Sequence, residues 1–184
     1  VVDAYLAALT VPNFLYLVLG GAVTTAVIPF LVAQPEGTAR WRQVDALTTR
    51  LLVGTGLAIV LAAVVPRWVV GLVAPGLPPE AAELAGTLFL WMMPASLFMI
   101  LGSLYTGVLN AHDRFQVAAL ARLALNGAVV GFLWLGAAVW GIHAAAYGVL
   151  AGAAAFLLMQ MAQLYRIGYR WRWRWHHDDL GGIF

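Results

Sequence analysis

Long stretches of apolar residues without charge constrain this chain more than any other feature of its sequence. Residues 4–35 carry no formal charge, and the runs 51–65, 84–111 and 123–165 also lack Asp, Glu, Lys and Arg. About 20 apolar residues in a helix are enough to cross the hydrocarbon core of a bilayer. Each run is bounded by charged residues or by Gly and Pro, and the longer runs exceed what a soluble core helix needs. The sequence therefore predicts an all-α fold, a polytopic membrane helix bundle.

The composition agrees with a lipid environment and argues against several kinds of chemistry. Hydrophobic residues make up 63% of the 184 residues and charged residues only 10%, whereas soluble domains carry about 25% charged residues. There is no Cys, and hence no disulfide framework and no thiolate nucleophile. The sequence also lacks a Walker loop, a dinucleotide-binding glycine motif, His-Glu-x-x-His and Gly-x-Ser-x-Gly. We therefore predict no enzymatic activity, no cofactor and no nucleic-acid partner.

Polar and turn-forming segments divide the chain into about five transmembrane helices. The dividing segments lie near residues 35–42, 66–79, 110–115 and 140–143, and we expect bends at Pro12, Gly20-Gly21, Pro29 and Pro94. The predicted spans lie near residues 4–33, 46–65, 84–111, 116–138 and 143–166. In residues 167–184, Arg first alternates with Trp and Tyr, which is typical of a segment at the headgroup level and predicts an interfacial tail.

The arginines predict an orientation in the membrane, because cytoplasmic loops hold the excess of positive charge. One set of alternate loops contains nearly all of them, including Arg114 and the tail arginines, and the other set contains only Arg67. The hinge at 110–115 and the tail are therefore predicted to be cytoplasmic, with Val1 outside. The chain opens at Val1 without a Met, and we expect it to be a piece of a longer protein.

Few polar residues in the apolar zone could take part in transport. Charge inside a membrane is costly and faces a cavity, a partner or the interface. Asp3 is either an N-cap or dipole partner of its helix or a transport residue, and Arg122 is expected to extend to the headgroups. Asn13 and Asn126 either join helices by hydrogen bonds or contact a substrate.

A second set of polar residues lies close to the end of the chain. The segment 176–179 has the sequence His-His-Asp-Asp, which contains residue types found in metal sites. A metal site needs several ligands that converge in space. We therefore expect a solvated polar tail here and predict no metal.

The order of several motifs resembles that of the MurJ/MviN family of lipid II flippases, especially its actinobacterial-type members. The similar motifs are Asp3-Ala-Tyr5, Thr10-Val-Pro-Asn13, Gly20-Gly-Ala-Val-Thr-Thr-Ala-Val-Ile-Pro29, Val65-Pro-Arg-Trp68, Ala74-Pro-Gly-Leu77, Pro94-Ala-Ser-Leu97, Gly107-Val-Leu-Asn-Ala-His-Asp-Arg-Phe115 and Leu125-Asn126. The resemblance covers nearly the whole chain. It implies that residues 1–184 are a partial N-terminal lobe containing helices two to six of a larger flippase, whose remaining helices are missing.

The resemblance also implies a function and its partners. Members of this family export lipid II, the undecaprenyl-pyrophosphate-linked peptidoglycan precursor, across the cytoplasmic membrane by alternating access between two lobes. The implied partners are this lipid-linked precursor, membrane lipids, the missing remainder of the flippase and cell-wall synthesis proteins. The substrate or transport candidates are Asp3, Asn13, Arg114 and Asn126, with Asp3 and Arg114 placed by family motifs.

One departure from the family pattern leaves two alternatives open. Many Gram-negative-type members carry an arginine pair after Pro-Asn, whereas Phe14-Leu15-Tyr16-Leu17 follows Asn13 here. The first alternative is a related exporter of another polyprenyl-linked glycan or a drug. The second is a membrane scaffold that recruits cell-wall enzymes without transporting anything.

Overall fold

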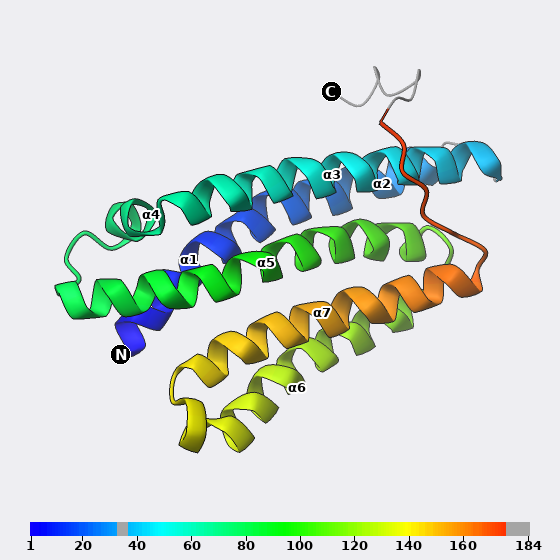
Figure 1. Cartoon of the computed structure of the whole chain (residues 1–184). Helices are drawn as coiled ribbons and strands as arrows, with labels where there is room; N and C mark the ends of the chain where they lie inside the picture. The colour runs from blue at the N-terminus through cyan, green and yellow to red at the C-terminus, as the bar shows by residue number, and fades with distance from the viewer. Residues whose placement is uncertain (33–36, 176–184) are drawn as a thin grey trace.

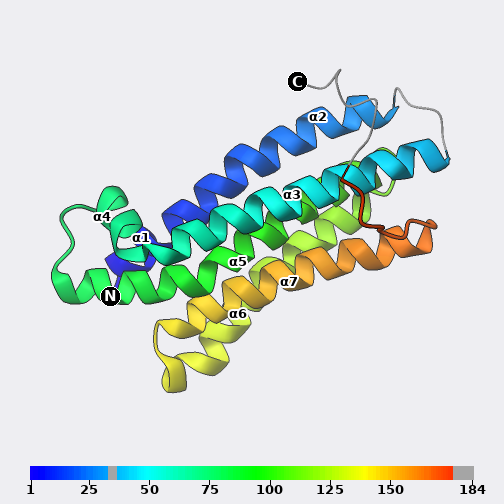
Figure 2. The same ribbon diagram turned by 45° about the horizontal axis from the view of Figure 1, so that its top comes forward.

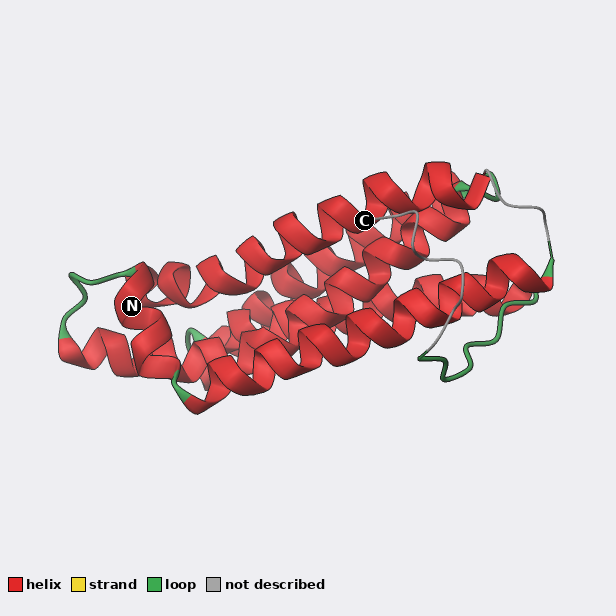
Figure 3. Cartoon of the chain, turned by 90° about the horizontal axis from the view of Figure 1, so that it is seen from above, coloured by secondary structure: helices red, strands yellow, loops and turns green. Residues whose placement is uncertain are grey.

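The protein is a bundle of membrane-spanning helices. The computed structural model describes residues 1–32 and 37–175, and within these ranges it contains helices and loops but no strand (Figures 1 and 3). In the described part of the chain, five helices are long and apolar enough to cross a membrane. The predicted fold class, an all-α bundle of about five transmembrane helices, is therefore confirmed. The segment 176–179, for which we expected no metal site, lies outside the described residues.

The first span consists of three helical segments that follow one another without a loop. Helix α1 covers Val2–Leu15, the π-helix η1 covers Tyr16–Gly20, and α2 covers Gly21–Val32. A π-helix makes wider turns than an α-helix and appears as single-turn bulges, frequently at functional sites. The pair Gly20-Gly21, where the sequence predicts a bend, lies where η1 ends and α2 begins.

Two long helices and one short helix follow. Helix α3 covers Thr38–Val64, α4 covers Pro66–Val73 and α5 covers Pro79–Asn110. The second span is predicted near residues 46–65, and helix α3 begins before it, at Thr38. Polar residues in its first turns are buried, among them Arg40, Gln43 and Asp45. Helix α5 begins at Pro79. Proline has no backbone N–H, but an N–H in the first helical turn has no partner within the helix, so no hydrogen bond is lost there.

Helices α6 (Phe115–Trp140) and α7 (His143–Arg166) form a hairpin. Gly141 in the turn has a φ of 54°, a conformation that favours glycine. Gly148 and Gly152 on α7 face the backbone of α6. A Cβ atom at Gly152 would lie 2.6 Å from the carbonyl oxygen of Leu125, and one at Gly148 would lie 2.8 Å from the Cα of Val129. The spacing Gly-x-x-x-Gly thus permits close approach of the two helices.

Helix α5 occupies the centre of the bundle. It contacts every other helical element, and α1–η1–α2 lies on the side of α5 opposite to α6 (Figures 1 and 2). Its buried side chains dominate the core, and the largest include Leu88, Phe89, Met92, Met93, Ile100, Leu104 and Leu109. Lipid tails are as apolar as these side chains, so moving the side chains from lipid into the bundle gives no hydrophobic gain. Their burial stabilises the helix bundle through close packing instead.

After α7 the chain turns back across α3 in an extended segment, residues 167–175, which we call the strap. The carboxylate of Asp45 accepts a hydrogen bond of 3.1 Å from the backbone N–H of Arg172, and it pairs with Nε of Arg174 at 3.5 Å. The ring of Tyr169 is buried against Trp41, with a centroid distance of 5.2 Å. Burial raises the pKa of the Tyr169 phenol, so its hydroxyl stays protonated at physiological pH.

Substituting Asp45 by Ala is expected to release the strap from α3. The Asp45 side chain is only 5% exposed, and removing a buried acceptor of this kind costs about 1–3 kcal/mol. Trypsin should therefore cut the intact protein after the strap arginines markedly faster. The control is Glu83→Ala, because Glu83 and Arg67 form an ion pair whose side chains are 69% and 78% exposed, and such pairs contribute little. Equal cleavage rates in the two variants would contradict this role of Asp45.

Candidate functional site

A pocket of about 390 Å³ lies between the first span and helices α5, α6 and α7. We call it the inner pocket. Polar side chains line it although it lies among apolar helices, and its lining residues are Tyr16, Leu17, Gly20, Gly21, Thr24, Thr25, Ser103, Thr106, Arg122 and Phe156. Polar groups within membrane-spanning helices are costly unless they face a cavity or a partner.

The wide turn η1 forms one wall of the inner pocket. Gly20 is buried there, and a Cβ atom at this position would lie 3.0 Å from the Tyr16 ring and 3.1 Å from Oγ of Ser103. One turn later, the Thr24 hydroxyl donates a hydrogen bond of 2.8 Å to the carbonyl oxygen of Gly20. Thr25 donates in the same way to Gly21 at 3.0 Å. Both hydroxyl oxygens keep lone pairs that could accept hydrogen bonds from a ligand.

The opposite wall comes from α5 and α7. The Thr106 hydroxyl oxygen lies 2.9 Å from the carbonyl oxygen of Gly102 and 2.7 Å from Oε1 of Gln160. Gln160 is fully buried, and its Nε2 has no hydrogen-bond partner among the described residues. With its amide turned by 180°, Nε2 would donate to Thr106, and the Thr106 hydrogen would be free for Gly102. This network fixes the Thr106 hydroxyl at the pocket wall.

Arg122 supplies the positive charge of the inner pocket. It is the only charged residue in the sequence of α6 and lies on the order of 10 Å from the start of the helix, at roughly 1.5 Å per residue. The extension of Arg122 to the headgroups stays a prediction. Arg122 is exposed, and it lines the inner pocket.

The structure places the four predicted site residues at three different depths. Asn13 lies one turn before Leu17, and Asn126 one turn after Arg122, so each is close to a residue that lines the inner pocket. Both asparagines are exposed. Asp3 lies in the first turn of α1 and Arg114 at the N-cap of α6, at opposite ends of the bundle. The four residues therefore do not form one site within this chain.

The inner pocket combines one guanidinium group, several hydroxyl groups and apolar side chains. A guanidinium fork binds phosphate and carboxylate oxygens with two parallel hydrogen bonds, hydroxyls suit sugar or amide groups, and Leu17 and Phe156 suit a hydrocarbon chain. Over residues 1–32 and 37–175 no group of His, Cys, Asp and Glu could hold a metal ion. The pocket is therefore suited to an anionic, polar headgroup that is attached to an apolar chain.

Comparisons with known proteins show which proteins this chain is similar to. The family model described as Lipid II flippase MurJ matches residues 1–184. The chain is 32% identical over 178 residues to the lipid II flippase MurJ of Burkholderia cenocepacia. This match covers 90% of this chain and 34% of that protein. It is also 32% identical over 145 residues to a probable lipid II flippase MurJ of Synechocystis sp., covering 76% of this chain and 26% of the relative.

A solved structure of similar fold is titled Lipid II flippase MurJ, inward closed conformation. It superimposes with a TM-score of 0.79 at 24% identity, and the match covers 95% of this chain and 37% of the solved one. At this identity the likeness establishes the helix arrangement. The chain spans about a third of the length of the first curated relative and of the solved structure.

Proposed function

Because the chain belongs to the MurJ lipid II flippase family, we propose that it forms part of the first lobe of a lipid II flippase. In this proposal the whole protein moves the undecaprenyl-pyrophosphate-linked peptidoglycan precursor across the cytoplasmic membrane by alternating access between two lobes. The described helices correspond to helices two to six of the flippase.

The inner pocket is the observation that carries this proposal. A pyrophosphate and sugar headgroup cannot cross hydrocarbon unaided, because its polar groups would lose their hydrogen bonds to water. A transporter replaces that water with polar side chains near the middle of the membrane. Arg122 and the surrounding hydroxyl groups offer such a replacement, and Asn13 and Asn126 extend the polar surface by one turn.

The remaining candidates have separate roles in this proposal. Arg114 lies at the N-cap of α6, at the end of the bundle that the arginine count assigns to the cytoplasm, where it could meet the headgroup as it enters. Asp3 lies at the other end, in the first turn of α1. A single substrate could contact both residues only in succession, which is what alternating access requires.

The competing functions make different predictions for the full-length protein. A related exporter of another polyprenyl-linked glycan or a drug would use the same inner pocket for a different cargo. A scaffold for cell-wall synthesis proteins would not need Arg122 in the pocket, since a charge within the membrane is costly without a function. The position of Arg122 in a polar pocket therefore favours transport over the scaffold.

We expect the full-length protein to restore growth to a strain depleted of its own lipid II flippase. The measurement is the amount of lipid II exposed on the outer face of the membrane, together with growth. Restored growth with restored exposure would support transport of lipid II. Stable insertion without restored exposure, in a host whose own flippase gene does restore it, would count against lipid II as the cargo.

A further inference from the structure

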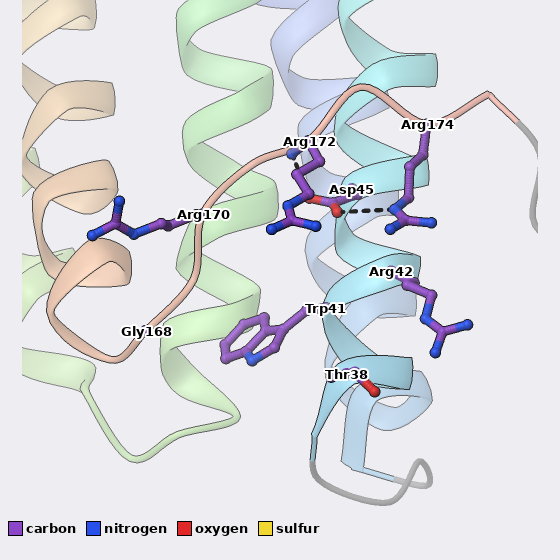
Figure 4. Close-up of a pocket in the computed structure, with 8 residues that line it drawn as sticks. All are labelled: Thr38, Trp41, Arg42, Asp45, Gly168, Arg170, Arg172 and Arg174. Carbon is purple, nitrogen blue, oxygen red and sulfur yellow. Dashed lines mark hydrogen bonds and ion pairs between the residues drawn. The ribbon is translucent and has the colours of Figure 1, made fainter.

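A second pocket, of about 430 Å³, lies between the first turns of α3 and the strap, at the same end of the bundle as the hinge 110–115 (Figures 1 and 4). We call it the arginine pocket. Its lining residues are Thr38, Trp41, Arg42, Asp45, Gly168, Arg170, Arg172 and Arg174. Nothing in the proposed transport step uses these residues.

The strap presents its arginines to this pocket because of its extended backbone. Gly168 has a φ of 92° and turns the chain out of α7, and in an extended segment alternate side chains point to opposite sides. Arg170, Arg172 and Arg174 line the pocket. The residues between and after them, Trp171, Trp173 and Trp175, are exposed.

Asp45 fixes the strap without neutralising the pocket. Its carboxylate binds the backbone N–H of Arg172 at 3.1 Å and pairs with Nε of Arg174 at 3.5 Å, which is longer than the usual charge-assisted bond of about 2.7–2.9 Å. Within residues 1–32 and 37–175, the guanidinium groups of Arg42, Arg170 and Arg172 have no carboxylate within ion-pair distance. Four guanidinium groups and one carboxylate therefore line the pocket, which leaves a formal excess of three positive charges.

This excess of charge is held in a fixed arrangement. Tyr169 is buried within the strap and contacts the rings of Trp41 and Tyr105. The backbone N–H of Arg174 donates to the Thr49 hydroxyl at 3.3 Å. The strap is thus anchored at Tyr169, Arg172 and Arg174, and a ligand bound in the arginine pocket would not have to order it.

We propose that the arginine pocket binds the phosphate group of an anionic membrane lipid. Guanidinium forks match phosphate oxygens in geometry and charge. Basic clusters next to the cytoplasmic end of a membrane helix attract anionic lipids. The exposed tryptophans favour a lipid over a soluble anion, because Trp173 and Trp175 are 60% and 53% exposed beside the pocket and tryptophan side chains prefer the headgroup layer.

The test measures lipid binding to the full-length protein in neutral detergent. The probe is dansyl-labelled phosphatidylglycerol, and binding is read by energy transfer from tryptophan. We expect the double variant Arg42→Gln/Arg170→Gln to weaken binding by about tenfold to thirtyfold, at about fivefold per arginine. The matched control is Arg50→Gln/Arg166→Gln, which removes the same charge from exposed positions outside the pocket and should leave binding unchanged. An equal loss in both double variants, or no loss in either, would overturn the proposal.

Competition separates the possible sources of the phosphate group. Unlabelled phosphatidylglycerol should displace the probe and phosphatidylcholine should not. Displacement by inorganic pyrophosphate at a lower concentration than by phosphatidylglycerol would overturn the lipid assignment in favour of a soluble anion. If the Gln variant failed to fold, Arg42→Lys/Arg170→Lys would replace it, because it keeps the charge but loses the fork and should bind more weakly than the unmodified protein. The readout is binding, so it does not depend on whether the protein flips lipid II.

Discussion

Replacing Arg122 by Gln in the full-length protein is expected to lower lipid II transport by about tenfold to a hundredfold. The variant keeps a polar side chain but loses the only cation that lines the inner pocket within the described residues. A hydrogen bond to a charged group contributes about 1.5–3 kcal/mol, which corresponds to this range of rates if it forms as the headgroup passes. The measurement is lipid II exposed at the outer face of the membrane, normalised to the amount of inserted protein.

Two further variants show whether the position or merely the charge of Arg122 matters. Arg122→Lys keeps the charge and should retain an intermediate rate, because an ammonium group cannot form the two parallel bonds of a guanidinium. Arg50→Gln removes a charge from an exposed position on α3 that lines neither pocket, and transport should not change. A fully active Arg122→Gln protein would show that the inner pocket is not on the transport path.

The substitution Gly152→Ala is expected to lower the free energy of unfolding by about 1–3 kcal/mol, the usual cost of overpacking. The new methyl group would lie 2.6 Å from the carbonyl oxygen of Leu125 and 3.2 Å from its Cα. These are backbone atoms of α6, so no side-chain rotation relieves the contact and the two helices must separate. The measurement is thermal unfolding of the purified full-length protein in detergent.

The control for this substitution is Gly131→Ala on α6. A Cβ atom at Gly131 meets no atom within 4 Å in this chain, and alanine is a better helix former than glycine by about 1 kcal/mol. The control should therefore be neutral or slightly stabilising. If both variants unfolded at the same temperature as the unmodified protein, the close approach of α6 and α7 at Gly152 would be wrong.

The fold could be predicted from sequence because lipid imposes a simple rule on it. Each spanning helix needs a long apolar run, and few alternatives to a helix satisfy the backbone in hydrocarbon. The runs and the polar breaks between them are visible in the chain without any structure. The start of α3 was harder to predict, since Arg40 and Asp45 look like loop residues in the sequence but are buried within the helix.

The inner pocket could not be predicted from the sequence in the same way. Its walls come from segments far apart in the chain, near residues 20, 103, 122 and 156, and none of these segments is unusual by itself. Arg122 stands out in the sequence as a charge in an apolar span, but its depth from the cytoplasmic end also fits an extended, headgroup-directed side chain. The hydroxyl residues at 24, 25, 103 and 106 face the same space only after folding, so their positions in the sequence do not reveal the pocket.

The strap shows a similar limit. Alternation of arginine with tryptophan is typical of an interfacial segment, and the exposed tryptophans fit this description. The sequence did not indicate that Asp45, more than a hundred residues earlier, would hold the backbone of this segment. Long-range pairing of one carboxylate with a backbone N–H leaves no periodic pattern in a sequence.

The hairpin of α6 and α7 has a consequence for the order of assembly. The contacts between these two helices are the most extensive in the bundle, and they join residues that are close in sequence across a short turn at Gly141. Contacts of low sequence separation form fastest, because little loop entropy is lost when they close. We therefore expect the hairpin to associate as it emerges into the bilayer, before the more distant contacts between the first span and α5 are complete. A defect at Gly152 would then act during biogenesis and reduce the yield of inserted protein.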